Sequence, residues 1–250
     1  MKNEVLGRMK NVECRRKNVL TTLLWAAFFV LQSSFFVSCK ESDNTVEEYP
    51  DWKNKNESFF SQLYEQAKAA EAAGSKEYKV IRNWTFMPDG DTFKGVAADH
   101  VVVQVLQDGG SQNPSPLYND TVVVSYQGRL LPSTSYANGR VFEDHLNGAT
   151  DPRAFDYVKM GVSTTVTVSS TGTTSSSSNI DGFTTVLQHM RVGDFWRVYI
   201  PYQLGYGEED TSTIPAYSTL VFDLSLKAYY HPGEVVPPVQ AKASSEWIED

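Results

Sequence analysis

The sequence predicts an α+β fold in which an antiparallel sheet carries most of the core. β-Branched and aromatic residues gather in short runs that polar turns separate, as in antiparallel domains. These runs are Tyr78–Phe86, His100–Leu106, Val122–Leu131, Phe195–Ile200 and Thr219–Tyr230. One further segment, Glu57–Ala73, has apolar residues three and four apart, which is the spacing of an amphipathic helix. Strands at short spacing beside few helices are typical of α+β domains, and the 41% hydrophobic content is enough for a globular core.

The N-terminus has the order of a secretory signal peptide. Basic residues 15–17 precede an apolar run from Val19 to Val37, and the small residue Ser38 follows it. The end of this run resembles a bacterial lipobox, which implies that residues 1–38 are removed and that Cys39 becomes the lipid-bearing first residue. The alternative is a retained transmembrane anchor, because a run of about 19 residues is near the lower limit for crossing a bilayer.

The remaining chain is expected to have four parts that differ in composition. They are a polar tether at 39–56, an N-terminal helix with extra strands at 57–118, a main domain at 119–230 and a proline-rich flexible tail at 231–250. Asn56 and Gly74 have the residue types that begin and end helices, so we expect them to cap the helix between them.

A Ser/Thr-rich stretch interrupts the main domain. Of the 16 residues from Ser163 to Ser178, 13 are Ser or Thr. The first part, Thr164–Ser169, contains two valines in alternation and is predicted to be a strand. The second part, Ser170–Ser178, offers almost no apolar surface for packing and is predicted to be a flexible surface loop.

Several function classes are excluded by residue content. A net charge of -8 argues against nucleic-acid binding, which needs clustered Lys and Arg. The four histidines lie far apart and there are two cysteines, so we expect no metal site. Glycine-rich phosphate loops and a GxSxG nucleophile elbow are absent, so we expect neither a cofactor nor covalent hydrolysis.

The second half of the chain carries a set of ordered motifs over about 110 residues, from Asp120 to Leu226. They are Val122–Gly128, Gly139–Glu143, His189–Asp194, Val198–Pro201, Leu204–Gly207, Ile214-Pro215 and Thr219–Leu224. In order and spacing these motifs resemble the FKBP family of peptidyl-prolyl isomerases. The resemblance implies a twisted antiparallel sheet wrapped over one short helix, here at about Asp181–His189.

The resemblance also implies a pocket between the helix and the sheet. The residues that match catalytic positions are Tyr126, Phe142, Glu143 and Tyr206, and those that match substrate-binding positions are Ile180, Phe183, Ile214 and Phe222. Three positions depart from the family pattern, with Glu143 for the usual Asp, Phe183 for the usual Trp and Asn179 for the usual Val. A further family aromatic residue has no clear match, and Phe155 is a candidate for it.

Three functions remain open at this stage. The resemblance implies an isomerase that acts on the X–Pro bonds of polypeptide clients and assists folding in the bacterial envelope, bound to the membrane by its lipid anchor. The outer membrane, with a periplasmic or surface face, is the expected location. The departures favour a second function, a non-catalytic FKBP-like binding or chaperone module. A third is a structural lipoprotein that uses helix Glu57–Ala73 as a docking surface.

Overall fold

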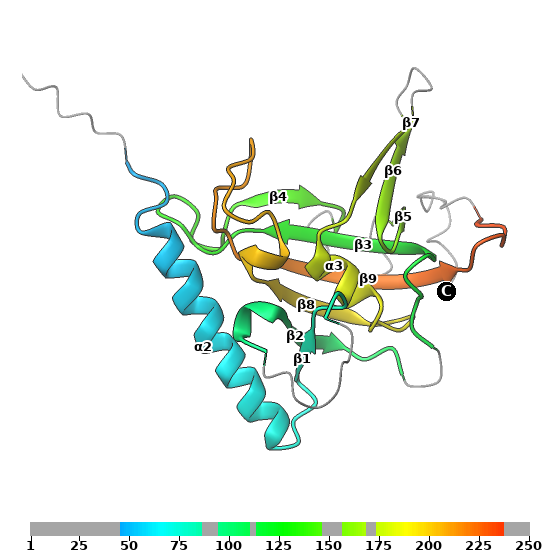
Figure 1. Cartoon of the computed structure of the whole chain (residues 1–250), viewed down its shortest axis with the longest axis horizontal. Helices are drawn as coiled ribbons and strands as arrows, with labels where there is room; N and C mark the ends of the chain where they lie inside the picture. Colours follow the sequence, from blue (N-terminus) through cyan, green and yellow to red (C-terminus); the bar gives the residue numbers. More distant parts are fainter. Residues whose placement is uncertain (1–45, 87–94, 111–113, 147–156, 169–173, 238–250) are drawn as a thin grey trace, which may run out of the picture. The chain divides into compact units, whose positions relative to one another are not determined.

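The computed structural model describes residues 46–86, 95–110, 114–146, 157–168 and 174–237, with the backbone alone at 165–168 and 174–177 (Figure 1). The chain divides into two compact units, residues 1–46 and 47–250, and all elements described here belong to the second. The predicted signal peptide, Cys39 and Phe155 lie outside the described residues. Within the described ranges, no helix combines the length and the apolar character that a bilayer crossing requires.

The described part of the second unit contains two α-helices, two short 3-10 helices and nine strands. The helices are α2 (Trp52–Ala72), η1 (Ala97–Asp99), α3 (Asp181–Leu187) and η3 (Tyr202–Leu204). The strands are β1 (Tyr78–Arg82), β2 (His100–Gln107), β3 (Thr121–Arg129), β4 (Val141–Asp144), β5 (Val158–Gly161), β6 (Thr164–Val168), β7 (Thr174–Ser178), β8 (Phe195–Ile200) and β9 (Leu220–Tyr230). The five predicted runs coincide with β1, β2, β3, β8 and β9, although β1 ends four residues early.

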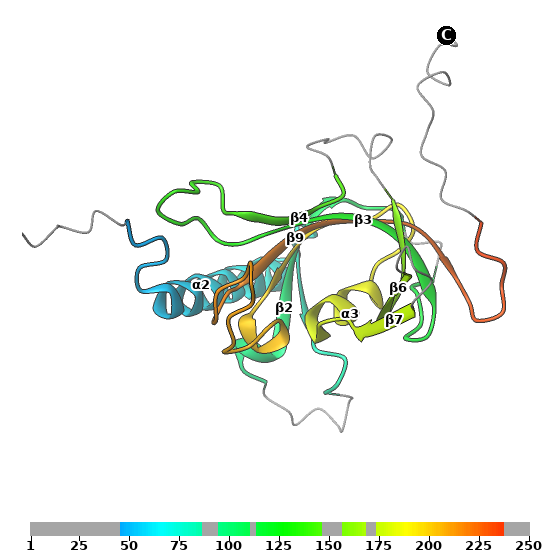
Figure 2. The same cartoon turned by 90° about the horizontal axis from the view of Figure 1, so that it is seen from above.

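Seven of the strands form one sheet in the order β1-β2-β8-β9-β3-β4, with β5 paired to β3 beside β4. All pairings within it are antiparallel, so the predicted α+β fold is confirmed. Figure 2 shows the strands β3 and β9 passing over α3, as the predicted sheet wrapped over a short helix requires.

Helix α3 lies at the centre of the core. All of its residues from Gly182 to Leu187 are buried. The helix approaches β8 so closely that a Cβ atom at Gly182 would lie 2.3 Å from Cγ2 of Ile200. On β8 the side chains of Trp196, Val198 and Ile200 are buried, which is the period of two that a sheet with one covered face requires. The sheet therefore presents its apolar face to α3.

The start of α2 differs from the prediction. The helix begins at Trp52 rather than at Glu57, and its N-cap is Asp51 rather than Asn56. The polar composition of residues 52–56 suggested a tether, but the Trp52 side chain is only 7% exposed and belongs to the main core. The predicted end of the helix is close to the observed one, because Gly74 follows the C-cap with a φ of 79°.

The apolar face of α2 is covered by its own domain. Phe60 and Ala67 are buried together with Val102 of β2, and Leu63 and Tyr64 pack beside them. The apolar spacing that suggested a docking surface is therefore explained by packing within the domain itself.

The Ser/Thr-rich stretch forms a hairpin. Strand β7 pairs with β6 from Thr164 opposite Ser178 to Val168 opposite Thr174, and the two strands stand out from the main sheet (Figure 1). The prediction of a loop is wrong for residues 174–178, because backbone hydrogen bonds to β6 order this strand without apolar side chains. The predicted C-terminal tail is described only to Pro237, and its first residue is held, since His231 Nδ1 lies 2.8 Å from Asp120 Oδ1.

Candidate functional site

Four aromatic rings from four different elements meet beside α3. Phe222 of β9 is at the centre, with its ring centroid 5.2 Å from Phe183 of α3, 5.6 Å from Phe142 of β4 and 6.0 Å from Tyr126 of β3. Tyr126 and Phe183 are themselves 5.4 Å apart. All four pairs meet edge to face, the geometry that aromatic quadrupoles favour. The predicted pocket residues from sheet and helix are thus brought together as one ring cluster.

Gly128 on β3 makes room for this cluster. A Cβ atom at that position would lie 2.5 Å from the Phe142 ring and 2.8 Å from the Phe222 ring. No side chain larger than hydrogen fits there without moving both rings. Sequence reasoning treated Gly128 as one residue of a strand motif and missed this role. The available signal was a glycine inside a strand, which often marks a close approach of other groups.

A buried hydroxyl and a half-exposed carboxylate form the polar edge of the cluster. The Tyr126 hydroxyl donates a hydrogen bond of 2.6 Å to Oε1 of Glu143, whose side chain is 45% exposed. Nε2 of His145 lies 3.3 Å from the same oxygen. Burial, and then the hydrogen bond to Glu143, raise the pKa of Tyr126 well above its ordinary value. Tyr126 therefore stays protonated at neutral pH and holds the Glu143 carboxylate beside the rings.

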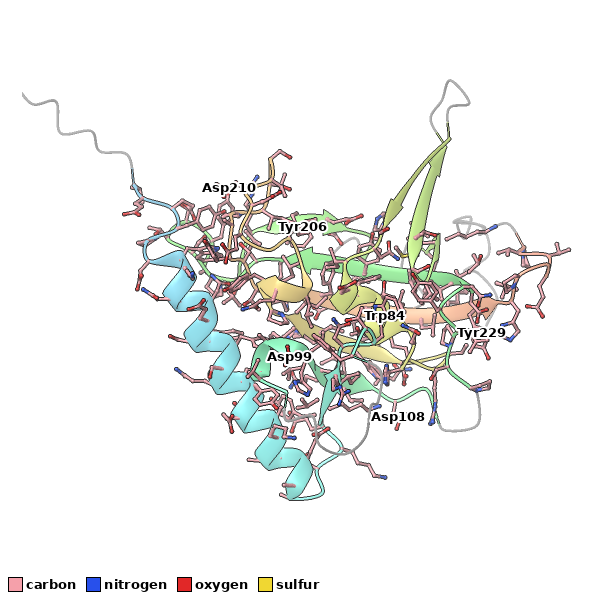
Figure 3. All side chains as sticks on the ribbon, in the orientation of Figure 1. Trp84, Asp99, Asp108, Tyr206, Asp210 and Tyr229 are labelled. Atoms are coloured by element: carbon pink, nitrogen blue, oxygen red, sulfur yellow. The ribbon has the colours of Figure 1, made fainter. Side chains whose placement is uncertain are left out.

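Tyr206 is at the rim of the site on the segment that follows η3, where Figure 3 labels it. It is 45% exposed, in contrast to the rings of the cluster. Burial of its hydroxyl, and then the negative charge of Glu143, raise the pKa of Tyr206. Its hydroxyl therefore keeps its proton at neutral pH, on a side chain that is partly open to solvent.

The remaining predicted site residues border the same apolar cluster. Ile214 is 4% exposed and belongs to the core that contains Phe183 and Phe222. Ile180 is the N-cap of α3 and packs partly buried against that core. Asn179, where the family pattern has Val, donates hydrogen bonds from Nδ2 to the carbonyl oxygens of Gly161 and Val162 at 2.9 and 3.0 Å. This departure therefore ties the start of α3 to the end of β5.

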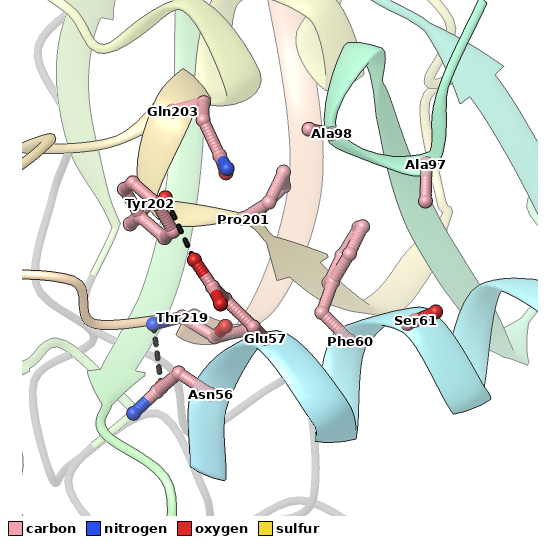
Figure 4. Close-up of a pocket in the computed structure, with 10 residues that line it drawn as sticks. All are labelled: Asn56, Glu57, Phe60, Ser61, Ala97, Ala98, Pro201, Tyr202, Gln203 and Thr219. Carbon is pink, nitrogen blue, oxygen red and sulfur yellow. Dashed lines mark hydrogen bonds between the residues drawn. The ribbon is translucent and has the colours of Figure 1, made fainter. Parts of the chain in front are cut away.

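A concavity lies apart from the rings, between α2, η1 and η3 (Figure 4). Its volume is about 150 Å³. It is lined by Asn56, Glu57, Phe60, Ser61, Ala97, Ala98, Pro201, Tyr202, Gln203 and Thr219. Sequence reasoning did not predict this concavity, because it depends on how α2 lies against segments from the far end of the chain.

Comparison with known proteins identifies both a matching family model and several relatives. Residues 113–227 match the family model of the FKBP-type peptidyl-prolyl cis-trans isomerases. The macrophage infectivity potentiator of Trypanosoma cruzi is 28% identical over 203 residues, which cover 79% of this chain and 80% of that protein. The peptidyl-prolyl cis-trans isomerase Mip of Coxiella burnetii is 32% identical over 130 residues, or 52% of this chain and 44% of that protein. FkpA of Escherichia coli K12, an FKBP-type peptidyl-prolyl cis-trans isomerase, is 29% identical over 155 residues, or 61% of this chain and 45% of that protein.

The chain thus spans less than half the length of the Coxiella and Escherichia relatives. Among solved structures, FkpA from Escherichia coli superimposes with a TM-score of 0.44 and 24% identity, covering 71% of this chain and 60% of that one. A peptidyl-prolyl cis-trans isomerase from Pseudomonas syringae gives a TM-score of 0.41 and 23% identity, covering 70% and 96%. Residues 113–227, which contain the ring cluster, are therefore a domain of the FKBP-type peptidyl-prolyl cis-trans isomerase family.

Proposed function

We propose that this protein catalyses the cis–trans isomerisation of X–Pro bonds in polypeptide clients. The observation that carries the proposal is the ring cluster of Tyr126, Phe142, Phe183 and Phe222, with the Tyr126–Glu143 hydrogen bond at its edge. Membership of the family supports the same reaction. No nucleophile, metal or cofactor is needed, because no covalent bond is made or broken.

The chemical task is to lower a rotational barrier. Rotation about an amide costs about 18–20 kcal/mol, because it breaks the resonance of the C–N bond. A site accelerates the rotation if it binds the twisted amide more tightly than either planar form. The twisted amide has a less polar carbonyl, so an apolar site lined by rings favours it. In this proposal the prolyl ring lies against Phe142, Phe183 and Phe222.

Tyr206 supplies the polar contact in this mechanism. Its side chain is half-exposed at the rim, and its hydroxyl keeps its proton at neutral pH. It donates a hydrogen bond to a carbonyl oxygen of the client and so fixes the client's backbone while the prolyl bond turns. The part of Glu143 is indirect in this proposal. Its carboxylate accepts the hydrogen bond of the Tyr126 hydroxyl and so fixes the orientation of the Tyr126 side chain.

The test is a proline-isomerisation assay on short peptides with an apolar residue before the proline, using protein that begins at Lys40. The wild type should accelerate the reaction. Tyr206→Phe should lower kcat/KM about tenfold with the folded stability unchanged, because it removes only a hydroxyl. Tyr118→Phe is the matched control, since Tyr118 is also 45% exposed and lies outside the site. Equal activity in both variants would remove Tyr206 from the mechanism.

The second candidate is a binding module without catalysis, favoured by the departures at Asn179, Glu143 and Phe183. It predicts that the wild type binds a macrolide FKBP ligand or prolyl peptide without accelerating isomerisation. A protein that neither binds nor accelerates would contradict both candidates.

We further propose that the protein acts in the bacterial cell envelope, attached by lipid at Cys39. The basic, apolar and Ser38-Cys39 order of the N-terminus supports this location. Mass spectrometry of the mature protein should find an acylated Cys39 as the first residue. An unmodified Cys39 in a chain that keeps its first 38 residues would contradict it.

A further inference from the structure

We propose that the first two turns of α2 position the rim of the prolyl site, with Trp52 and Asn56 as positioning residues for substrate binding. This inference rests on the function proposed above and names a part of the chain outside residues 113–227. It assigns a role to helix α2, which carries none of the family motifs.

The rim in question is the segment 202–219, which connects η3 to β9. It carries Tyr206 and Ile214, both of them predicted site residues, and it leads directly into Phe222. Apart from its short 3-10 helix, this segment has no regular secondary structure. Its conformation therefore depends on contacts with other parts of the molecule.

Two side chains of α2 bind the C-terminal end of this rim. Asn56 is fully buried, and its Oδ1 accepts a hydrogen bond of 2.7 Å from the backbone N–H of Thr219 (Figure 4). Trp52 Nε1 donates a hydrogen bond of 2.8 Å to the Ser218 hydroxyl, which in turn donates to the carbonyl of Pro215 at 2.6 Å. Trp52 and Asn56 are one turn apart, so both reach the rim from the same face of the helix.

Two more contacts from the same turns reach the rest of the rim. The Tyr202 hydroxyl donates a hydrogen bond of 3.0 Å to Oε1 of Glu57, as Figure 4 shows. The ammonium group of Lys53 lies 4.3 Å from the centre of the Tyr217 ring, within cation–π distance. The helix thus contacts both ends of a segment whose middle carries Tyr206 and Ile214.

Hydrogen bonds within the rim connect the anchored residues to the neighbour of Tyr206. Tyr217 has a φ of 61°, an uncommon conformation for a residue with a side chain, and its N–H donates to the carbonyl of Gly207 at 3.0 Å. Gly207 is the neighbour of Tyr206, and its own N–H donates to Tyr202 at 2.8 Å. A shift of the anchored residues 217–219 therefore moves the backbone next to Tyr206, from which its side chain extends.

The experiment compares two contacts of the same helix in the full-length protein, purified in detergent. Asn56→Ala removes the acceptor of the Thr219 N–H at the rim. Glu71→Ala is the matched control, because Oε1 of Glu71 also accepts a backbone N–H, that of Val80 on β1, but at the opposite end of α2. The readouts are kcat and KM on a prolyl peptide, together with hydrogen exchange of the amides of residues 202–219.

We expect Asn56→Ala to lower kcat/KM about tenfold, with the loss in KM, because small displacements of binding groups are costly. Hydrogen exchange should become faster in residues 202–219 and not in β3 or α3. Glu71→Ala should leave KM and these amides as in the wild type. The inference is overturned if Asn56→Ala leaves KM and exchange unchanged, or if both variants change them equally.

A second variant protects the test against simple misfolding. Trp52→Phe keeps an aromatic ring in the core and removes the N–H donor to Ser218, so it should raise KM about threefold with the fold intact. An unchanged KM in Trp52→Phe would overturn the role of this residue. If the wild type shows no isomerase activity, the proposed function fails, whereas faster exchange in residues 202–219 of Asn56→Ala would still support the anchoring.

Discussion

Helices α3 and α2 are attached to the same sheet by different interactions. In α3 the residues from Gly182 to Leu187 are all buried, so apolar packing surrounds the helix. Helix α2 is three times as long, with 21 residues against 7, but buries only Trp52, Asn56, Phe60 and Ala67. Its contacts with the rim are largely hydrogen bonds. The comparison indicates that α3 is held by burial on all sides, whereas α2 is held by a narrow apolar face together with hydrogen bonds to the rim.

Truncating one phenylalanine in each helix is the strongest way to test this difference. Phe183 and Phe60 are both 4% exposed. Phe183→Ala should lower the free energy of unfolding by about 3–5 kcal/mol and abolish prolyl-ligand binding, because it opens a cavity beside the Tyr126 and Phe222 rings. Phe60→Ala should cost about 2–3 kcal/mol, since its smaller cluster borders a concavity that can close. Urea unfolding measures both, and an equal or larger loss for Phe60→Ala would contradict the comparison.

A glycine at each helix gives a second, smaller test. Gly182→Ala places a methyl group against Ile200 and should cost about 1–3 kcal/mol of stability together with weaker ligand binding. Gly74→Ala, just beyond the end of α2, meets no atom within 4 Å but requires a φ of 79°. Backbone strain alone should then cost about 1 kcal/mol, with ligand binding unchanged. If Gly74→Ala weakened ligand binding, the far end of α2 would also affect the site, contrary to this prediction.

The third test uses pH. Burial, and then the hydrogen bond and charge of Glu57, raise the pKa of Tyr202 from 10.0 to about 12, with smaller contributions from Glu208 and Tyr217. Because the folded pKa is above the unfolded one, this stabilisation is complete below pH 10 and is lost as the pH rises from 10 to 12. Between pH 10 and pH 12, the free energy of unfolding should fall by about 1–2 kcal/mol less in Tyr202→Phe than in the wild type. If the free energy of unfolding fell equally with pH in the wild type and the variant, Tyr202 would not be the group responsible.

Sequence patterns predicted the parts of the fold that repeat a simple rule. The alternation of Phe195–Ile200 matched β8 at both ends, and the motifs gave the position of α3. The ring cluster followed from the same motifs, because residues that match a family pattern inherit its geometry. Patterns of this kind report on regular backbone and on packing that other proteins share.

The parts that sequence reasoning missed depend on contacts between distant segments. Asn56 has the residue type of a helix cap, and nothing in its neighbours shows that it instead binds Thr219 from inside the helix. Trp52 stands among polar residues, so its burial could not be read from periodicity. Strand β7 has the composition of a loop and is ordered by its partner β6. In each case the deciding interaction lies on another part of the chain.

The hydrogen bonds between α2 and the rim also set an order of events during synthesis. Trp52 and Ser218 are 166 residues apart, and Asn56 and Thr219 are 163 apart. At about 5–20 residues per second, the ribosome needs roughly 10–30 s to make the partners of a helix that has already emerged. During that interval the Trp52 indole N–H lacks its Ser218 acceptor and the buried Asn56 amide lacks the Thr219 N–H. Helix α2 therefore completes its docking on the rim only after residues 218 and 219 are made, and until then its first turns add to the risk of aggregation.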